Sequence, residues 1–252
     1  MLGEIHNREG ERLDYTFQPG ADDNRCVVVI GHGVTGNKDR PFSCALADGL
    51  ANAGIASIRL SFSGNGNSAG AFADSTISKE IDDLFAVIDR LVEVLGDVVV
   101  GYAGHSMGGA VGVMATGRDQ RISFLISLAG MVRTAQFAQR KFGDLVPGKG
   151  LMWDKPECPL SQKYMDDMAH HGDLLSYGPE IEVPWLFVHG TADDVVPIVD
   201  SRDMYGCAQE PKELCEIEGA DHVFSGETMS VMVNKVTGWT VALIASNGRK
   251  KR

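Results

Sequence analysis

The chain alternates between two hydrophobic patterns. Short, continuously apolar runs predict strands that are buried on both faces, as in a parallel sheet, because neither face then needs polar residues. Segments with apolar residues three and four positions apart predict helices that cover such a sheet. The predicted strands are 26–30, 55–60, 98–100, 124–129, 184–188 and 214–217, and the predicted helices are 42–53, 76–95, 110–116, 198–208 and 227–245.

The helix predicted over 76–95 has the clearest periodicity. Its apolar residues recur at helical spacing, and Gly96 follows them in the position of a C-cap. Asp82, Asp83 and Asp89 lie between the apolar positions. We therefore expect these three carboxylates to form the solvated face of the helix.

The order of the elements predicts the fold class. Strands that alternate with helices form a mostly parallel sheet with helices on both faces, so we expect one α/β domain over 1–252. Near the N-terminus, segments 4–6 and 12–17 flank Asn7 and Gly10, two residues that suit a tight turn. They predict an antiparallel hairpin ahead of the first parallel strand.

The alternation breaks over 131–183. Helix-like pieces at 132–142 and 160–169 are separated there by loop signals rich in Pro and Gly. An insertion of this size between two sheet strands is a candidate cap or lid. We expect its aromatic residues Phe142, Trp153 and Tyr164 either to line an apolar substrate pocket or only to hold the insertion on the core.

Composition and charge restrict the partners and the location. The 252 residues are 44% hydrophobic and carry a formal net charge of -11, which would repel nucleic acid and anionic membrane surfaces. No apolar run approaches the roughly 18 residues of a membrane span, and the polar N-terminal segment lacks the core of a signal peptide. We therefore expect a cytoplasmic protein that binds neither membrane nor nucleic acid. Its oligomeric state, monomer or homodimer, stays open.

Two minor groups of residues indicate no chemistry of their own. The five cysteines show no Cys-x-x-Cys spacing, so we expect reduced thiols that fill the core. The adjacent His170 and His171 lack further ligands at metal-binding spacing, so we expect no metal. We expect the basic cluster at 248–252 to be a solvated tail.

The segment Gly104-His105-Ser106-Met107-Gly108 follows a run of β-branched residues and precedes a run of small ones. This is a strand, a sharp turn and a helix, the context in which Gly-x-Ser-x-Gly presents a nucleophilic serine. Gly104 and Gly108 leave room for the chain to pass close to itself. Because Gly-x-Ser-x-Gly alone is a weak signal, an ordinary glycine-rich turn remains an alternative at this point.

A second glycine-rich turn, at 31–36, formally matches the dinucleotide fingerprint Gly-x-Gly-x-x-Gly. That motif requires a helix to begin within it and an acidic residue at the end of the next strand. Here the loop continues to Pro41, and the next strand is followed by Ser61. We therefore prefer another use of the His32-Gly33 pair, which is to turn a backbone N–H toward the nucleophile.

An acid and a base follow two later strands. Asp193 and Asp194 come after strand 184–188, and His222 comes after strand 214–217. Parallel strands bring their carboxyl ends to one edge of the sheet, so these residues can converge on Ser106. A serine hydroxyl needs an imidazole to take its proton, and the imidazole needs a carboxylate to fix its tautomer. The order Ser, Asp, His is typical of α/β-hydrolases.

Five motifs in this order make the whole chain resemble the α/β-hydrolase superfamily, and within it the small serine esterases of the cinnamoyl/feruloyl esterase and lysophospholipase-like group. They are His32-Gly33-Val34-Thr35-Gly36-Asn37-Lys38, Gly64-Asn65-Gly66-Asn67-Ser68, Gly104-His105-Ser106-Met107-Gly108-Gly109, His189-Gly190 with Asp193 and Val196-Pro197, and Ala220-Asp221-His222.

The resemblance implies a role for several of these residues. It implies an α/β-hydrolase fold and a triad of Ser106, Asp193 and His222, with Asp193 rather than Asp194 as the acid. The implied oxyanion-hole donors are the backbone N–H groups of Val34 and Met107. His32 and His105, which belong to the two turns, are further candidates for the wall of the substrate pocket.

The expected function is hydrolysis of a small-molecule carboxylic ester through an acyl-enzyme, without a cofactor. The same residues would serve a thioesterase, an amidase or an acyltransferase, and the sequence does not decide among these. A ligand-binding protein that has kept the fold without turnover is the alternative of another class. An intact triad argues against it, because a binding protein has no use for a strained serine.

Overall fold

The computed structural model describes residues 2–21 and 25–250 of the chain. The side chains of the basic cluster 248–252, which the sequence predicts to be a solvated tail, lie outside the described part. Within the described residues, no helix is both long enough and apolar enough to cross a bilayer.

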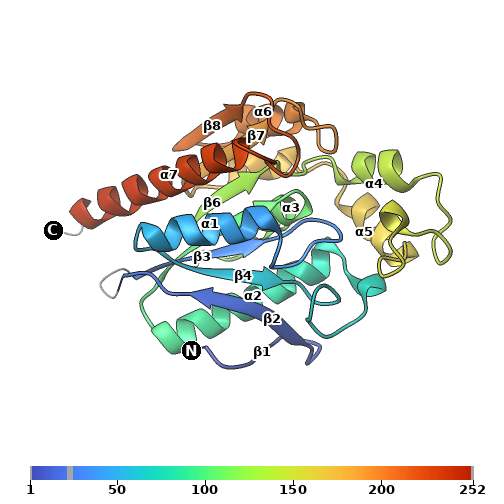
Figure 1. Cartoon of the computed structure of the whole chain (residues 1–252), viewed down its shortest axis with the longest axis horizontal. Helices are drawn as coiled ribbons and strands as arrows, with labels where there is room; N and C mark the ends of the chain where they lie inside the picture. Colours follow the sequence, from blue (N-terminus) through green and yellow to red (C-terminus); the bar gives the residue numbers. More distant parts are fainter. Residues whose placement is uncertain (1, 22–24, 251–252) are drawn as a thin grey trace.

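The centre of the molecule is an eight-stranded sheet in the order β1-β2-β4-β3-β5-β6-β7-β8 (Figure 1). The six strands from β4 to β8 in this order are parallel, and β2 joins them antiparallel at β4. Strands β1 and β2 pair antiparallel, which confirms the predicted hairpin. The strands are β1 (Ile5–His6), β2 (Arg12–Gln18), β3 (Cys26–Gly31), β4 (Ala56–Ser61), β5 (Val99–His105), β6 (Ile122–Leu128), β7 (Trp185–Gly190) and β8 (Lys212–Ile217).

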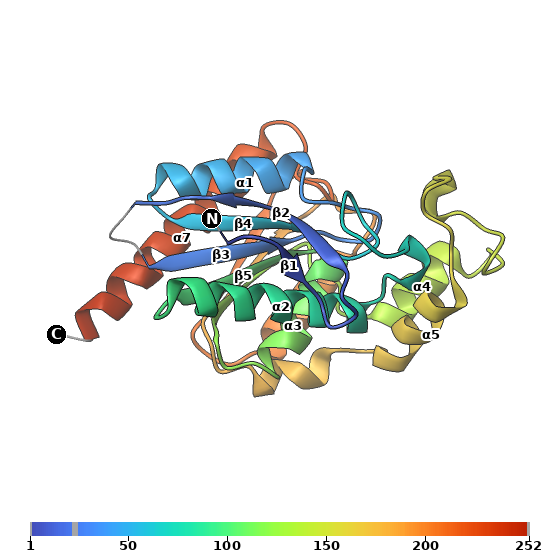
Figure 2. The ribbon, with the colours of Figure 1, turned by 90° about the horizontal axis from the view of Figure 1, so that it is seen from below.

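Helices cover both faces of the sheet, as the alternating pattern predicts (Figure 2). Helices α1 (Pro41–Asn52) and α7 (Thr228–Lys250) lie on one face, and α2 (Ile77–Leu95) and α3 (Met107–Thr116) lie on the other. Helix α6 (Ile198–Cys207) contributes Met204 to the same core as α2 and α3.

Each central strand supplies side chains to two separate cores. On β3, Val27 and Val29 pack in the core of α2 and α3, whereas Val28 and Ile30 pack in the core of α1 and α7. Successive side chains of a strand point to opposite faces, and here both faces are covered. This explains why the strand sequences are continuously apolar.

The element boundaries differ from the predictions at β5, which continues to His105 instead of ending at Val100, and at two helices. Helix α3 begins at Met107, three positions before the predicted start at Ala110, because the chain turns into the helix directly after Ser106. Helix α7 continues to Lys250, beyond the predicted end at Ala245. Glycines at positions 108 and 109 are poor helix formers, which explains the late predicted start of α3.

The segment 131–183 holds helices α4 (Thr134–Phe142) and α5 (Gln162–His171) and the short 3₁₀ helices η2 (Met152–Asp154) and η3 (Leu175–Glu180). Helices α4 and α5 pack together beside the carboxyl ends of the parallel strands (Figure 1). The Thr134 hydroxyl donates to the carbonyl of Met168 at 2.7 Å and so links the two helices. Arg133 forms ion pairs with Asp200 and Asp203 of α6, which join the segment to the core.

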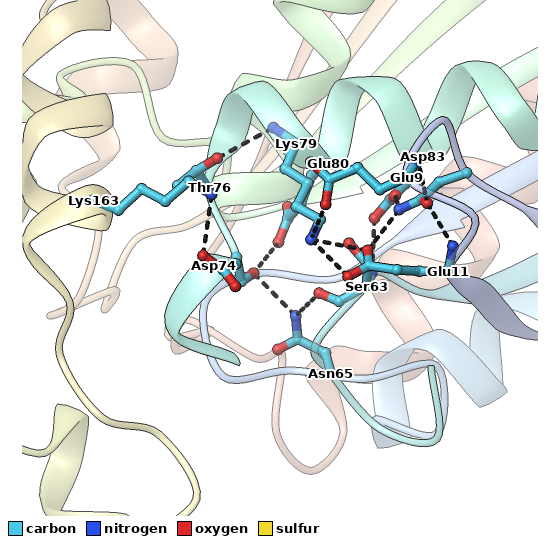
Figure 3. Close-up of polar contacts among 12 residues, drawn as sticks. Glu9, Glu11, Ser63, Asn65, Asp74, Thr76, Lys79, Glu80, Asp83 and Lys163 are labelled. Carbon is cyan, nitrogen blue, oxygen red and sulfur yellow. Dashed lines mark hydrogen bonds and ion pairs between the residues drawn. The ribbon is translucent and has the colours of Figure 1, made fainter. Parts of the chain in front are cut away.

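Two carboxylates of α2 are buried, and this corrects the expectation that Asp83 belongs to a solvated face. Asp83 is 0% exposed and accepts hydrogen bonds from the Asn7 side chain at 2.8 Å and from the Ser63 N–H at 2.7 Å. Glu80 is 1% exposed and accepts one from the Ser75 hydroxyl at 3.2 Å (Figure 3). The partners come from the hairpin and from the loop after β4. A helical pattern by itself gives no information about such distant donors.

The burial of Glu80 leads to a prediction about stability. Burial, and then the neighbouring Asp83 carboxyl, raise the pKa of Glu80 well above its usual value. A carboxyl whose pKa is raised by folding makes its full contribution to the free energy of unfolding at pH values below its pKa in the unfolded chain, which is about 4.5. Between that pH and the pKa of the folded state, the contribution falls by up to about 1.4 kcal/mol per pH unit. In Glu80→Gln an amide that stays neutral at every pH replaces the carboxyl. The variant is therefore expected not to lose this contribution to the free energy of unfolding as the pH rises.

Urea unfolding at pH 5, 7 and 9 checks the prediction. The excess of the free energy of unfolding of Glu80→Gln over that of the wild type is expected to be smallest at pH 5 and to grow toward pH 9. Glu157→Gln, which changes an exposed carboxylate, is the control and is expected to follow the wild type throughout. If the Glu80→Gln and wild-type curves are parallel from pH 5 to pH 9, Glu80 is not buried as a neutral acid.

Candidate active site

Ser106 occupies the turn between β5 and α3 in a conformation that a non-glycine residue rarely adopts. Its φ is 56° and its ψ is -118°, and such strain costs about 1–3 kcal/mol. The Ser106 N–H donates to the carbonyl of Leu128 at 3.0 Å, and its own carbonyl accepts from the N–H groups of Gly109 and Met131 at 2.9 and 3.0 Å. These bonds to β6 and to the loop beyond it hold the turn in place.

Glycines around Ser106 are required by close backbone approaches. A Cβ on Gly104 would lie 2.1 Å from the carbonyl oxygen of Gly108, and a Cβ on Gly108 would lie 2.6 Å from that of His32. A Cβ on Gly33 would lie 2.6 Å from the Ser106 Cβ. The turn after β3 therefore packs directly against the turn after β5, as the paired glycine motifs predict.

The structure brings Asp193, and not Asp194, to His222. The Nδ1 atom of His222 lies 2.8 Å from Oδ2 of Asp193. The Asp193 side chain is fully buried, and its Oδ1 accepts from the N–H groups of Val195 and Val196 at 2.8 and 2.9 Å. Asp194 is exposed. The two adjacent aspartates, which the residue pattern alone could not separate, thus have different environments.

His189 is a further partner of Asp193 that the sequence did not reveal. Its Nε2 lies 3.1 Å from Oδ2 of Asp193, and its Nδ1 lies 2.7 Å from the Ser201 hydroxyl. Burial raises the pKa of Asp193, but hydrogen bonds from His189 and His222 outweigh burial and hold the pKa below its usual value. The carboxylate is therefore ionised at neutral pH. The spacing of four between His189 and Asp193 is a turn spacing, and it gave no signal of this contact.

His105 positions the backbone of His222. Its Nε2 lies 2.8 Å from the His222 carbonyl oxygen, and the two rings lie 4.6 Å apart. Burial, and then the nearby His222, lower the pKa of His105 to about 3. The ring is therefore neutral, and Nε2 carries its proton because the carbonyl can only accept.

His32 fixes the peptide that precedes Val34. Burial lowers the pKa of His32 to about 4, and its Nε2 accepts from the Phe62 N–H at 3.1 Å. Its proton is therefore on Nδ1, which lies 2.9 Å from the Gly33 carbonyl oxygen. The Gly36 N–H donates to the same oxygen at 2.9 Å. In a planar trans peptide the C=O and N–H bonds point in opposite directions. The hydrogen bonds that hold the Gly33 carbonyl therefore also fix the direction of the Val34 N–H.

Ser106 and His222 line the same cavity, which has a volume of about 310 Å³. Among the residues that the structure describes, no hydrogen bond joins the Ser106 hydroxyl to His222; such bonds often tighten only when substrate is bound. The other residues that line the cavity are Gly33, Val34, Thr35, Gly36, Arg40, Phe42, His105, Phe137, Trp153, Lys155, Val195 and Val223.

The structure corrects part of the predicted pocket wall. His105 and Trp153 line the cavity, whereas His32, Phe142 and Tyr164 do not. Phe142 lies behind Trp153, with ring centroids 4.9 Å apart, and Tyr164 packs behind Phe142 at 6.0 Å. These rings hold the insertion together, the alternative that the sequence left open. Phe137, another aromatic residue of the insertion, also lines the cavity. Arg40 and Lys155 were missed because nothing in the sequence indicates which face of the insertion or of its neighbouring loop meets the cavity.

No group of three or more His, Cys, Asp or Glu side chains within the described ranges has an arrangement that could hold a metal ion. His171 instead contacts the Ser78 hydroxyl at 2.9 Å and Asp167 at 3.4 Å. His171 therefore belongs to the contact between α5 and α2.

Comparisons with known proteins identify the fold and the family of this chain. Est1E from Butyrivibrio proteoclasticus, solved with ferulic acid bound, superposes with a TM-score of 0.85 at 23% identity and covers 96% of this chain and 99% of that one. This similarity shows the α/β-hydrolase fold. A family model described as serine aminopeptidase, S33, matches residues 22–174. The chain belongs to this family of hydrolases.

Curated relatives extend over most of the chain. Monoacylglycerol lipase of Mycolicibacterium smegmatis is 26% identical over 269 residues, which cover 92% of this chain and 94% of that protein. The mitochondrial palmitoyl-protein thioesterase ABHD10 of Bos taurus is 27% identical over 183 residues, which cover 68% of this chain and 58% of that protein.

Proposed function

We propose that the protein is a serine hydrolase that cleaves small-molecule carboxylic esters through an acyl-enzyme, with Ser106, His222 and Asp193 as its catalytic residues. One observation carries the proposal: His222 is held by the ionised Asp193 at 2.8 Å and lines the same cavity as the strained Ser106. An imidazole with a fixed tautomer that shares a cavity with a serine hydroxyl can take the proton of that hydroxyl and so activate the serine.

The reaction follows from the donors and acceptors of these groups. Asp193 accepts the Nδ1 proton of His222, which leaves Nε2 free to take the proton of Ser106 as its oxygen attacks the ester carbonyl. The protonated His222 then gives this proton to the departing alcohol. Water enters, loses a proton to His222 and attacks the acyl-enzyme. His222 then returns this proton to the Ser106 oxygen as the acyl bond breaks, which releases the acid product and restores the free serine.

The proposed oxyanion hole consists of the Val34 and Met107 N–H groups. Met107 is the first residue of α3, so its N–H has no acceptor within the helix and lies at the positive end of the helix dipole. The Val34 N–H belongs to the peptide whose carbonyl His32 and Gly36 hold. Removal of one such donor typically costs about 2.7–4 kcal/mol of transition-state stabilisation.

We also propose that segment 131–183 acts as a cap over the active site. Phe137 of α4, Trp153 of η2 and Lys155 line the cavity together with residues of the turns that follow β3 and β5. The side chains of the segment would therefore contribute to substrate selection.

Thioester hydrolysis is the second candidate, since ABHD10, a relative of this chain, is named a palmitoyl-protein thioesterase. A thioester uses the same nucleophile, base and oxyanion donors as an ester and differs in its leaving group. The six apolar side chains in the cavity wall suit an acyl chain in either reaction.

A combined labelling and hydrolysis experiment tests the proposal. A fluorophosphonate probe is expected to label Ser106, as peptide mapping by mass spectrometry would show. p-Nitrophenyl esters of increasing chain length, with acyl-CoA thioesters of the same acids, are expected to show turnover for esters above thioesters. Turnover of thioesters alone would favour the second candidate. A wild-type protein that neither reacts with the probe nor hydrolyses any of these substrates would be a binding protein with a hydrolase fold.

A further inference from the structure

Two cationic side chains line the cavity of a strongly acidic protein. The chain has 23 Lys and Arg against 34 Asp and Glu, yet Arg40 and Lys155 reach the cavity wall. No Asp or Glu side chain from the described residues lines it. The local charge is therefore opposite in sign to that of the whole molecule.

Among the described residues, these two cations have no carboxylate partner, unlike several other cations of this protein. Lys79 and Arg133, for example, each form two or more ion pairs. Within the part of the chain that the structure describes, neither Arg40 nor Lys155 lies within 4.0 Å of a carboxylate oxygen. A cation that is half-buried and unpaired has lost water without gaining a counter-charge, and this is unfavourable unless a ligand supplies one.

Arg40 and Lys155 come from distant parts of the chain and converge on one residue. The Arg40 guanidinium donates to the Thr35 carbonyl oxygen at 3.1 Å, and the Lys155 Nζ lies 3.5 Å from the Thr35 hydroxyl oxygen. Thr35 follows Val34, whose N–H is a proposed oxyanion donor. The two charges therefore lie at one end of the cavity, beside the turn that would hold the ester carbonyl.

The rest of the cavity wall is mostly apolar. Phe42, Phe137, Trp153 and other apolar side chains form most of it. Helix α1 begins at Pro41, directly after Arg40, so the positive end of its dipole adds to the two charges. A ligand that matches this wall has an apolar body and one anionic end.

We propose that Arg40 and Lys155 bind a carboxylate or phosphate group of an otherwise apolar ester substrate. This proposal rests on the proposed function and narrows its substrate class to anionic esters. Arg40 can bind either group through a pair of parallel N–H donors, and Lys155 acts as a point charge. Two such contacts are expected to raise kcat/KM for an anionic substrate about tenfold or more over its neutral analogue.

Matched pairs of esters test the proposal and locate the anionic end. Mono-p-nitrophenyl suberate and its methyl ester differ in charge on the acyl side. 4-Carboxyphenyl hexanoate and its methyl ester differ on the alcohol side, and 4-phosphonooxyphenyl hexanoate replaces the carboxylate by a phosphate. Each kcat/KM is divided by the rate of hydroxide hydrolysis, which removes the difference in intrinsic reactivity. The wild type is expected to prefer an anionic substrate in at least one pair, and 1 M NaCl is expected to reduce this preference by screening.

Variants assign the preference to the two side chains. Arg40→Gln and Lys155→Gln are each expected to lower the anionic-to-neutral ratio of kcat/KM severalfold, whereas Arg40→Lys retains part of it. Lys149→Gln is the matched control, because Lys149 is an exposed lysine of the same segment that does not line the cavity. It is expected to leave both members of each pair unchanged.

Three results would overturn the proposal. These are a wild-type anionic-to-neutral ratio near one for both carboxylate pairs and for the phosphate ester, a ratio that neither Gln variant changes, and equal losses for both members of a pair in Lys155→Gln. The last would mean that Lys155 only fastens the segment to Thr35. If the proposed serine hydrolase activity itself were absent, the neutral esters and the fluorophosphonate would also fail to react, and this result distinguishes the two cases.

Discussion

Ser106→Ala is expected to lower kcat for a p-nitrophenyl ester by about 10⁴- to 10⁶-fold, because the acyl-enzyme can no longer form. Only the oxyanion donors and substrate binding would then contribute to catalysis. The residual rate and the loss of fluorophosphonate labelling are the two measurements. Substrate binding is expected to change little, since the hydroxyl occupies a small part of the cavity wall.

Ser123→Ala is the control for this variant. Ser123 lies at the start of β6, and its hydroxyl donates to the Arg121 carbonyl oxygen at 3.5 Å. It is expected to react with the probe and to turn over esters as the wild type does. Full activity of Ser106→Ala would remove Ser106 from the mechanism, and labelling at another serine would identify the nucleophile instead.

Asp193→Asn is expected to lower kcat by about 10⁴-fold. Asp193 accepts N–H groups from Val195, Val196, His189 and His222. An amide nitrogen cannot accept, so Asn at this position leaves at least one of these donors without a partner. If His222 changes its tautomer to compensate, its Nε2 carries the proton and can no longer take one from Ser106.

Asp194→Asn is the matched control, because it makes the same chemical change one residue away at an exposed side chain. It is expected to keep kcat within about threefold of the wild type, as surface substitutions rarely disturb their surroundings. Circular dichroism and thermal unfolding of both variants separate a catalytic loss from a folding defect. Equal losses of kcat in the two variants would refute the choice of Asp193 as the acid.

Several features of the fold were predictable because they depend on residues close together in the sequence. The continuous apolar runs at 26–30 and 124–129 indicated strands buried on both sides, and the structure has them in the two-sided core of β3 and β6. The helix over 76–95 was predicted from its spacing and from Gly96. Gly104 and Gly108 indicated the sharp turn at Ser106 in the same way.

The positions of polar side chains were harder to predict, because burial of a charge depends on its partners. Asp83 has the periodicity of a surface residue, but Asn7 and Ser63, far from it in sequence, provide donors that allow it to be buried. His189 is part of one of the five motifs, but only the structure shows that it lies at the end of β7 and contacts Asp193.

The sequence by itself determined the order of strands and helices, the serine turn and the three polar residues placed after parallel strands. Local spacing and backbone sterics are sufficient for these. Only the tertiary structure decided which aromatic rings face the cavity and that Arg40 and Lys155 meet at Thr35. Such contacts join residues up to 120 positions apart, and they depend on how the segment 131–183 packs against the turns of the sheet.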